Sequence, residues 1–241
     1  MELATSDQAA AKTFYGKLFG WSFRDNPMGP DSFYTMFQLD GRDASAAYQL
    51  DAKQLERAVP PHWNLYIATS DANATAASAK ENGGNVIMAP FDVFDSGRMA
   101  VIQDPTGAIF SIWQPVKQTG IGIAGVNNAF CWADLNTTDP QKASAFYSAV
   151  FGWEIRAGEK DPSGYLHINN GKDAIGGIPP VRPGPPPHWM IYYQVDDCDA
   201  ATSKANNLGG RTYRQPTTIE TVGRMSVVAD PQGAVFALFA P

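Results

Sequence analysis

Phe14-Tyr15-Gly16-Lys17-Leu18-Phe19-Gly20-Trp21 returns later in the chain as Phe146-Tyr147-Ser148-Ala149-Val150-Phe151-Gly152-Trp153. The apolar residues of the first copy, extended back to Ala11, recur at spacings of three and four, which predicts one apolar stripe on a helix. Asp7 and Asp139 stand where each helix needs an N-cap, and Gly20 and Gly152 predict left-handed ends. The repeat therefore predicts a tandem duplication.

Further paired signals follow both helices in the same order. They are His62-Trp63 and His188-Trp189, Gly83-Gly84 and Gly209-Gly210, and Asp104-Pro105-Thr106-Gly107 and Asp230-Pro231-Gln232-Gly233. Each module is predicted to run strand, helix and three strands, and then the same again. Residues 51–61 are predicted to be a polar linker and residues 62–67 a strand.

The repeat sets the predicted domain boundaries. We expect modules at residues 1–114 and 127–241, joined by a linker at residues 115–126. The first module is expected to have a truncated first strand, because few residues precede Asp7, whereas a strand-like run from Asn128 to Leu135 precedes Asp139.

Composition excludes several classes of protein. The net charge of −6 and the lack of a basic run argue against a nucleic-acid partner. No stretch approaches the ~20 apolar residues of a membrane span, so no membrane partner is expected. Cys131 and Cys198 are too few for a disulfide framework, which favours a cytoplasmic location.

The repeated Phe-Tyr-x-x-(Leu/Val)-Phe-Gly-Trp and Asp-Pro-x-Gly motifs resemble those of the vicinal oxygen chelate superfamily, which includes glyoxalases, bleomycin resistance proteins and extradiol dioxygenases. The resemblance covers nearly the whole chain. It implies an α+β fold of two tandem modules, each made of paired βαβββ units whose curved mixed sheets enclose a cleft. The resemblance does not imply one function, because this superfamily includes both enzymes and proteins that only bind a ligand.

The resemblance also implies where a metal ion would be held in the metal-using members. Counting from the motifs places those positions at Trp132, at Asn64 and Met190, and at Ser111 and Ala237. A divalent ion needs several imidazole or carboxylate ligands that converge, and neither module supplies two. No metal and no other cofactor is therefore predicted, with a divalent metal kept as the disfavoured alternative.

Strand alternation predicts which side chains face the clefts. The predicted ligand-binding residues are His62, Asn64, Tyr66, Ser111, Trp113, Trp132, His188, Met190 and Tyr192. Phe130, Trp132 and Asp134 are expected to share a face. Aromatic walls with few polar groups suit a flat or apolar small molecule.

His62 and His188 are the candidate catalytic residues, because an imidazole can act as acid or base near neutral pH. The alternative is that Pro-Pro-His-Trp forms a strand entry in which the ring hydrogen-bonds the backbone. Arg98 and Arg224 either anchor an anionic ligand or form ion pairs at strand ends.

Three functions stay open at this point. The first is small-molecule binding in aromatic-lined clefts by a protein that has lost the usual metal ligands, as in bleomycin resistance proteins. The second is a glyoxalase-like or dioxygenase-like enzyme that uses an atypical metal site or acid–base chemistry through His62 and His188. The third is an interaction module whose clefts are filled by Trp113 and Trp132. A monomer with an internal pseudo-dimer is expected in preference to a homodimer, and the sequence does not name the ligand.

Overall fold

The computed structural model describes residues 1–30, 32–158 and 163–241. The motif helices are confirmed as α1 (Gln8–Phe19) and α4 (Pro140–Phe151), each capped by the side chain of the predicted aspartate. Gly20 and Gly152 end them with φ values of 75° and 70°, a left-handed conformation that favours glycine. The predicted apolar stripe of α1 is its buried face.

The chain divides into two compact units that do not follow the sequence modules. Unit 1 contains residues 1–64, 121–131 and 191–241, and unit 2 contains residues 65–120 and 132–190. Each unit therefore combines one half of each module. This pairing within a single chain is what an internal pseudo-dimer requires, whereas the monomeric state itself stays a prediction.

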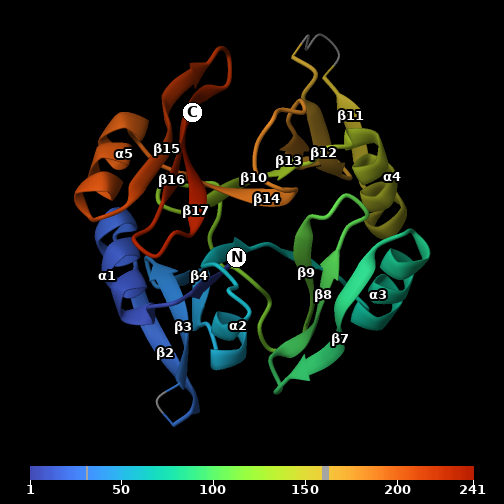
Figure 1. The fold of residues 1–241 in the computed structure, drawn as a ribbon, viewed down its shortest axis with the longest axis horizontal. Helices are drawn as coiled ribbons and strands as arrows, with labels where there is room; N and C mark the ends of the chain where they lie inside the picture. The colour runs from blue at the N-terminus through green and yellow to red at the C-terminus, as the bar shows by residue number, and fades with distance from the viewer. Residues whose placement is uncertain (31, 159–162) are drawn as a thin grey trace. The chain divides into compact units, whose positions relative to one another are not determined.

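Unit 1 contains a five-stranded sheet in the order β2-β3-β4-β1-β5. It also contains four hydrogen-bonded strands of another sheet, in the order β14-β17-β16-β15. The first five strands are β1 (Glu2–Thr5), β2 (Ser22–Gly29), β3 (Ser32–Leu39), β4 (Arg42–Gln49) and β5 (His62–Asn64). The others are β14 (His188–Gln194), which begins in unit 2, β15 (Arg211–Ile219), β16 (Gly223–Ala229) and β17 (Val235–Ala240). Helices α1 and α5 (Cys198–Asn207) pack against each other beside these sheets (Figure 1).

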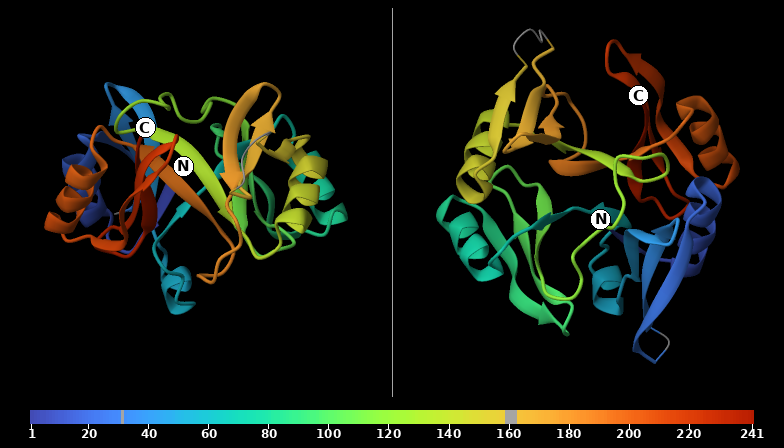
Figure 2. Two further views of the ribbon diagram at one scale, coloured as in Figure 1. Left: turned by 90° about the horizontal axis from the view of Figure 1, so that it is seen from above. Right: turned by 180° about the vertical axis from the view of Figure 1, so that it is seen from behind.

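Unit 2 contains a four-stranded sheet in the order β6-β9-β8-β7. It also contains four hydrogen-bonded strands of another sheet, in the order β11-β12-β13-β10. Its strands are β6 (Tyr66–Ala68), β7 (Asn85–Val93), β8 (Gly97–Gln103), β9 (Ile109–Pro115), β10 (Phe130–Asn136, whose first two residues belong to unit 1), β11 (Glu154–Ala157), β12 (Leu166–Asn170) and β13 (Asp173–Ile178). Helices α3 (Ala72–Glu81) and α4 lie side by side in the views of Figures 1 and 2. The α+β class and the mixed sheets are as predicted.

Three local expectations were incomplete or wrong. The predicted polar linker contains a short helix, α2 (Ala52–Glu56), which begins at a capping box formed by Asp51 and Gln54. The predicted strand over residues 62–67 is interrupted at Leu65, where β5 ends and β6 has not begun. Strand β7 was not located from the sequence.

The first strand, β1, is present with four residues, against seven in β10.

Separated sequence motifs meet at a buried tyrosine in unit 1. Trp63 Nε1 donates a hydrogen bond to the Tyr15 hydroxyl at 3.1 Å, and this hydroxyl donates to Asp230 Oδ2 at 2.9 Å. Tyr15 comes from the first module and Asp230 from the second. Burial, followed by the charge of Asp230, raises the pKa of Tyr15 well above its usual value, so the phenol stays a neutral donor.

The same junction is built in unit 2. Trp189 Nε1 donates to the Tyr147 hydroxyl at 2.9 Å, which donates to Asp104 Oδ2 at 3.1 Å. The other oxygen of Asp104 accepts the backbone N–H groups of residues 106, 107 and 108, which closes the predicted Asp-Pro-x-Gly turn. The repeated motifs thus join the two modules rather than only marking them.

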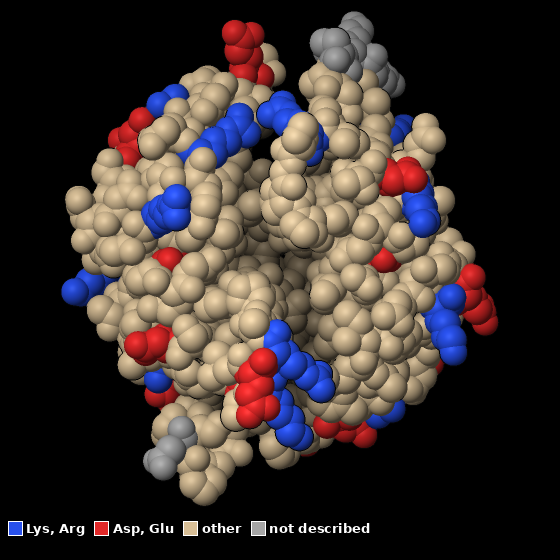
Figure 3. Space-filling view, viewed as in Figure 1, with Lys and Arg blue, Asp and Glu red and all other residues tan. Residues whose placement is uncertain are grey.

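Side chains of both signs are scattered over the face seen in Figure 3, without a broad basic patch. Among the described residues, no helix combines the length and the hydrophobicity needed to cross a membrane.

Unit 1 also contains a charged network that predicts a pH dependence of stability. Lys12 Nζ donates to Asp25 Oδ2 at 2.7 Å, and Thr35 Oγ1 donates to Asp25 Oδ1 at 2.6 Å. Burial opposes ionisation of Asp25, but the hydrogen bonds from Lys12 and Thr35 outweigh it and lower the pKa of this carboxyl below 3.8. The resulting stabilisation is present above that ordinary pKa and is lost as pH falls through the lower, folded-state value.

We therefore expect Asp25→Asn to lower the free energy of unfolding at pH 7 by about 1 kcal/mol and to have a smaller effect at pH 3. Urea unfolding at both pH values measures this. Asp95→Asn is the matched control, because Asp95 pairs with Lys117 while both side chains are about two-thirds exposed or more. An equal effect of Asp25→Asn at both pH values would contradict the assignment.

Candidate ligand-binding site

The strongest candidate site in unit 2 is a set of three residues on β10 and before β12, called the Asp134 cluster: Trp132, Asp134 and Tyr165. Trp132 Nε1 lies 3.1 Å from Asp134 Oδ1 and 2.7 Å from the Tyr165 hydroxyl. Tyr165 donates to the same carboxylate oxygen at 2.6 Å. Trp132 and Asp134 share a face, as strand alternation predicted.

The residues of the Asp134 cluster differ in burial, and burial affects the pKa of Tyr165. Asp134 is 6% exposed, whereas Trp132 and Tyr165 are partly exposed. Burial, followed by the charge of Asp134, raises the pKa of Tyr165 well above its usual value. The site therefore presents a carboxylate held by two neutral donors beside two accessible aromatic rings.

A glycine makes room for Tyr165. Gly177 on β13 is the register partner of Asp134, and a Cβ atom there would lie 1.9 Å from the Tyr165 hydroxyl oxygen. His167 on β12 packs edge-to-face against Tyr165, with ring centroids 5.1 Å apart. This contact places the His167 ring at the edge of the Asp134 cluster.

The part of unit 2 formed by residues 65–120, which comes mainly from the first module, carries further aromatic side chains. Tyr66 and Trp113 contact each other edge-to-face at 6.3 Å, and the Tyr66 hydroxyl approaches the sulfur of Met99 at 3.7 Å. Ser111, the register partner of Tyr66, is 0% exposed, so it does not present its hydroxyl at the surface of this conformation.

The structure divides residues that strand alternation had grouped. His62 and Asn64 lie in unit 1 on β5, which pairs with β1, whereas Tyr66 lies in unit 2 on β6, which pairs with β9. The single strand expected over these residues is therefore two short strands, β5 and β6, that pair with different neighbours.

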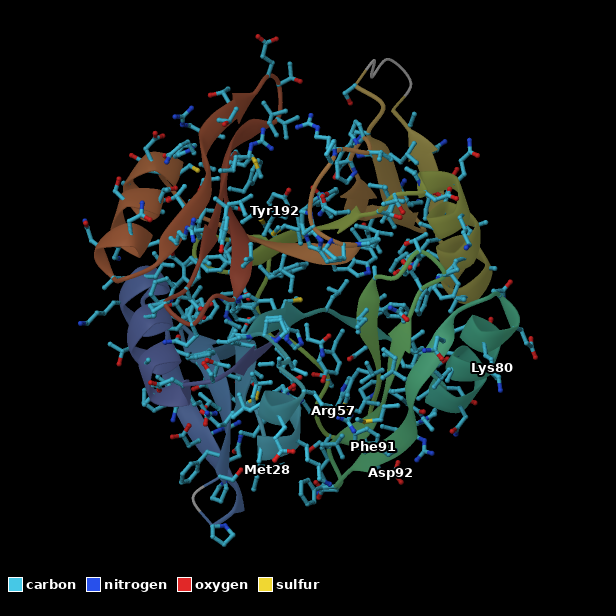
Figure 4. All side chains as sticks on the ribbon, viewed as in Figure 1. Met28, Arg57, Lys80, Phe91, Asp92 and Tyr192 are labelled. Atoms are coloured by element: carbon cyan, nitrogen blue, oxygen red, sulfur yellow. The ribbon has the colours of Figure 1, made fainter. Side chains whose placement is uncertain are left out.

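His188, Met190 and Tyr192, the last labelled in Figure 4, alternate along the single strand β14, and all three are partly buried, as strand alternation predicted for one face.

Both candidate catalytic histidines are fixed in the same way. His62 Nδ1 lies 2.8 Å from the carbonyl oxygen of Pro60, and His188 Nδ1 lies 2.8 Å from that of Pro186. A carbonyl oxygen only accepts, so Nδ1 carries the proton in each ring and Nε2 is the acceptor of the neutral tautomer. This backbone contact is the strand-entry arrangement that the sequence left as an alternative to catalysis.

Unit 1 contains a carboxylate that the sequence reasoning missed. Glu2 on β1 is 8% exposed and accepts a hydrogen bond from the Tyr34 hydroxyl at 2.8 Å. Glu2 stands five residues before Asp7, as Asp134 stands five before Asp139. That shared spacing was the available signal.

The donors at the implied metal positions do not suit a divalent ion. Trp132, Met190 and Ala237 have no oxygen or imidazole to offer, and Asn64 and Ser111 supply only neutral oxygens. Within residues 1–30, 32–158 and 163–241, no three His, Cys, Asp or Glu side chains gather as a metal site would need.

The two arginines are ion-paired. Arg98 binds Asp92 at 2.6 Å, and Arg224 binds Asp199 through two nitrogen atoms at 2.5 and 2.8 Å. The structure therefore supports the alternative in which Arg98 and Arg224 form ion pairs at strand ends.

A surface groove of about 310 Å³ lies elsewhere in unit 2, between α3 and α4. Its lining residues are Asn82, Gly83, Pro105, Lys142, Ala145 and Phe146, none of which was predicted to bind a ligand.

Comparisons with known proteins agree with this fold and its duplication. Residues 1–112 match the glyoxalase/bleomycin resistance protein/dioxygenase superfamily, and residues 132–239 match a glyoxalase-like domain. A Mycobacterium tuberculosis protein named "Putative glyoxylase CFP32" is 40% identical over 248 residues, which cover 100% of this chain and 93% of that protein. The anthracycline biosynthesis protein DnrV of Streptomyces peucetius is 34% identical over 255 residues, covering 98% of this chain and 90% of that protein.

Solved structures show the same fold at low sequence identity. The Mn(II)-bound glyoxalase of Novosphingobium aromaticivorans superposes with a TM-score of 0.66 at 18% identity, covering 99% of this chain and 80% of that one. The 2,3-dioxygenase LapB of Pseudomonas sp. KL28 gives a TM-score of 0.64 at 12% identity, covering 100% and 90%. The chain therefore belongs to the glyoxalase/bleomycin resistance protein/dioxygenase superfamily.

Proposed function

We propose that this protein binds a planar aromatic small molecule that carries a hydroxyl or amine donor, and that it does so at the Asp134 cluster without a metal ion. The observation that carries the proposal is the buried carboxylate of Asp134 between the partly exposed rings of Trp132 and Tyr165.

The physical basis is stacking combined with one directed polar contact. Aromatic rings bind a flat ligand through a large apolar contact area. A carboxylate strengthens any hydrogen bond from a ligand donor, and such charged hydrogen bonds contribute about 1.5–3 kcal/mol. Asp134 would therefore set the ligand's orientation, while the rings supply the contact area.

The names of two relatives point to the same ligand chemistry. DnrV and the Streptomyces sp. protein DauV, each 34% identical to this chain, are named for anthracycline biosynthesis, and anthracyclines are polycyclic aromatic compounds. We extend only that general class to this protein. A cytoplasmic location, inferred from two cysteines that are both free thiols, remains part of the proposal.

A titration with 2,6-dihydroxyanthraquinone, followed by tryptophan fluorescence, tests this function. We expect saturable quenching that EDTA leaves unchanged. Asp134→Asn is expected to weaken binding by about tenfold or more, because it removes the charge from the accepting oxygen. Asp95→Asn removes an exposed carboxylate elsewhere in unit 2 and should bind like the parent protein.

Quenching that is equally strong in Asp134→Asn would place the ligand elsewhere. Binding that disappears with EDTA and returns with a divalent metal would overturn the metal-independent part of the proposal.

A second candidate function is catalysis, which the strand-entry contact of the two histidines permits because it leaves Nε2 of each ring as an acceptor. His62 and His188 both have Nε2 as the basic atom, and CFP32 is named as a glyoxylase. The test is turnover of the hemithioacetal of methylglyoxal and glutathione, with elemental analysis of the purified protein. Turnover lost in a His62→Gln, His188→Gln double variant would support an enzyme, and the lack of turnover in the parent would reject this glyoxalase reaction.

A further inference from the structure

One face of the first sheet in unit 1 carries a set of polar and aromatic side chains, called the Glu2 cluster: Glu2, Tyr34, Tyr48 and Asn64. Glu2 is the register partner of Asn64 on β5, and Tyr34 is the register partner of Tyr48 across β3 and β4. Register partners in a sheet point to the same side, with Cβ atoms about 5 Å apart. The strand pairing therefore brings these side chains together.

This cluster is equivalent in position to the Asp134 cluster. Glu2 pairs with Ala46 on the parallel strand β4, as Asp134 pairs with Gly177 on β13. Ala46 in turn pairs with Met36, as Gly177 pairs with His167. Tyr34 and Tyr165 both stand two residues before these partners, and both donate to the carboxylate of the first strand. The duplication has thus kept a carboxylate held by a tyrosine in each unit.

The chemistry around the two carboxylates differs. In unit 2 the indole N–H of Trp132 lies at the carboxylate of Asp134, and Phe130 is the next residue along that strand face. In unit 1 Glu2 has Tyr34 as a hydrogen-bond partner, Asn64 as its register partner and the N-terminal amino group of Met1 as a nearby basic group. The Tyr48 hydroxyl accepts a hydrogen bond from Gln54 of α2 at 3.2 Å. His62 is the register partner of Ala4, which places it beside Asn64 on the same face.

Burial shows that this polar set is built into the fold. Glu2 is 8% exposed, while Tyr34, Tyr48 and Asn64 keep partial exposure. Burial, followed by the charge of Glu2, raises the pKa of Tyr34 well above its usual value, which keeps the phenol a neutral donor. A buried carboxylate held in place by a neutral phenol is a fixed acceptor rather than a mobile surface charge.

We infer that unit 1 carries a second small-molecule site at the Glu2 cluster, and that its ligand is a polyhydroxylated ring such as a monosaccharide or cyclitol. Carboxylate and amide oxygens accept from ring hydroxyls, the Asn64 amide N–H groups donate to them, and the two tyrosine rings cover the C–H face of the ring. This inference does not depend on the aromatic ligand proposed for unit 2.

The test uses the full chain with methyl α-D-glucopyranoside and myo-inositol as probes, and saturation-transfer NMR as the readout. We expect at least one probe to bind the parent protein. Glu2→Gln should reduce the affinity about tenfold or more, since a charged hydrogen-bond acceptor is removed. Asp95→Asn, which removes an exposed carboxylate in unit 2, should leave it unchanged.

Two further arms keep the result interpretable. Tyr48→Phe removes one hydroxyl from the face without touching the Glu2 carboxylate, so it should weaken binding even if Glu2→Gln lowers the thermal midpoint. Failure of both probes to bind the parent overturns the ligand class. Equal binding in the parent, Glu2→Gln and Tyr48→Phe overturns the site, and a loss in Asp134→Asn assigns the signal to unit 2.

Discussion

Asp104→Ala is expected to lower the free energy of unfolding by about 4 kcal/mol, the largest effect of any substitution considered for this protein. Asp104 is 3% exposed, and its two oxygens accept from the Tyr147 hydroxyl and from three backbone N–H groups of its own turn. Alanine leaves all of these buried donors without their acceptor. Urea unfolding followed by circular dichroism measures the loss.

Tyr147→Phe separates the contributions to this effect. It removes only the hydroxyl that links Trp189 to Asp104, so we expect a loss of about 1–2 kcal/mol. Thr106→Val, which removes one side-chain hydroxyl at the same turn, is a milder control. An Asp104→Ala protein as stable as Tyr147→Phe would mean that the turn contributes nothing beyond the tyrosine contact.

Gly177→Ala is expected to cost about 3 kcal/mol and to abolish binding of the planar ligand. The added Cβ atom would lie 1.9 Å from the Tyr165 hydroxyl oxygen and 2.1 Å from its ring carbon Cζ, so the tyrosine must leave Asp134 and Trp132. Urea unfolding gives the stability change, and quenching by 2,6-dihydroxyanthraquinone gives the binding change.

Gly184→Ala is the matched control in the same unit. The nearest atom to its added Cβ is the Arg182 carbonyl oxygen at 3.9 Å, so we expect stability within about 0.5 kcal/mol of the parent and normal quenching. If Gly177→Ala bound the ligand as tightly as Gly184→Ala, Tyr165 would have no part in the site.

Local signals in the sequence were sufficient for the helices and their ends. The apolar spacing around Phe14 and Tyr15, the aspartate caps and the terminal glycines each depend on residues within a few positions, and all were confirmed. The Asp-Pro-x-Gly turn is equally local, and its backbone hydrogen bond from Gly107 to Asp104 is present.

The combination of half-modules in each unit is not a local property. Nothing near Tyr15 in the sequence distinguishes Asp104 of its own module from Asp230 of the other, which it contacts. For the same reason, alternation could not show that a break at Leu65 separates Asn64 from Tyr66.

Glu2 was missed and Asp134 was assigned no role, because only the positions that hold metal ligands in the superfamily were searched. Their role depends on strand register, which brings Tyr34 and Tyr165 to them from later strands. Asp134 was expected to share a face with Trp132, but its tyrosine partner was not foreseen.

The most direct test of the account is a crystal structure of the protein with 2,6-dihydroxyanthraquinone. The account predicts the ring system against Trp132 and Tyr165, with a ligand hydroxyl donating to Asp134 and no metal ion between them. A ligand in the groove between α3 and α4, or one held by a metal ion, would contradict it.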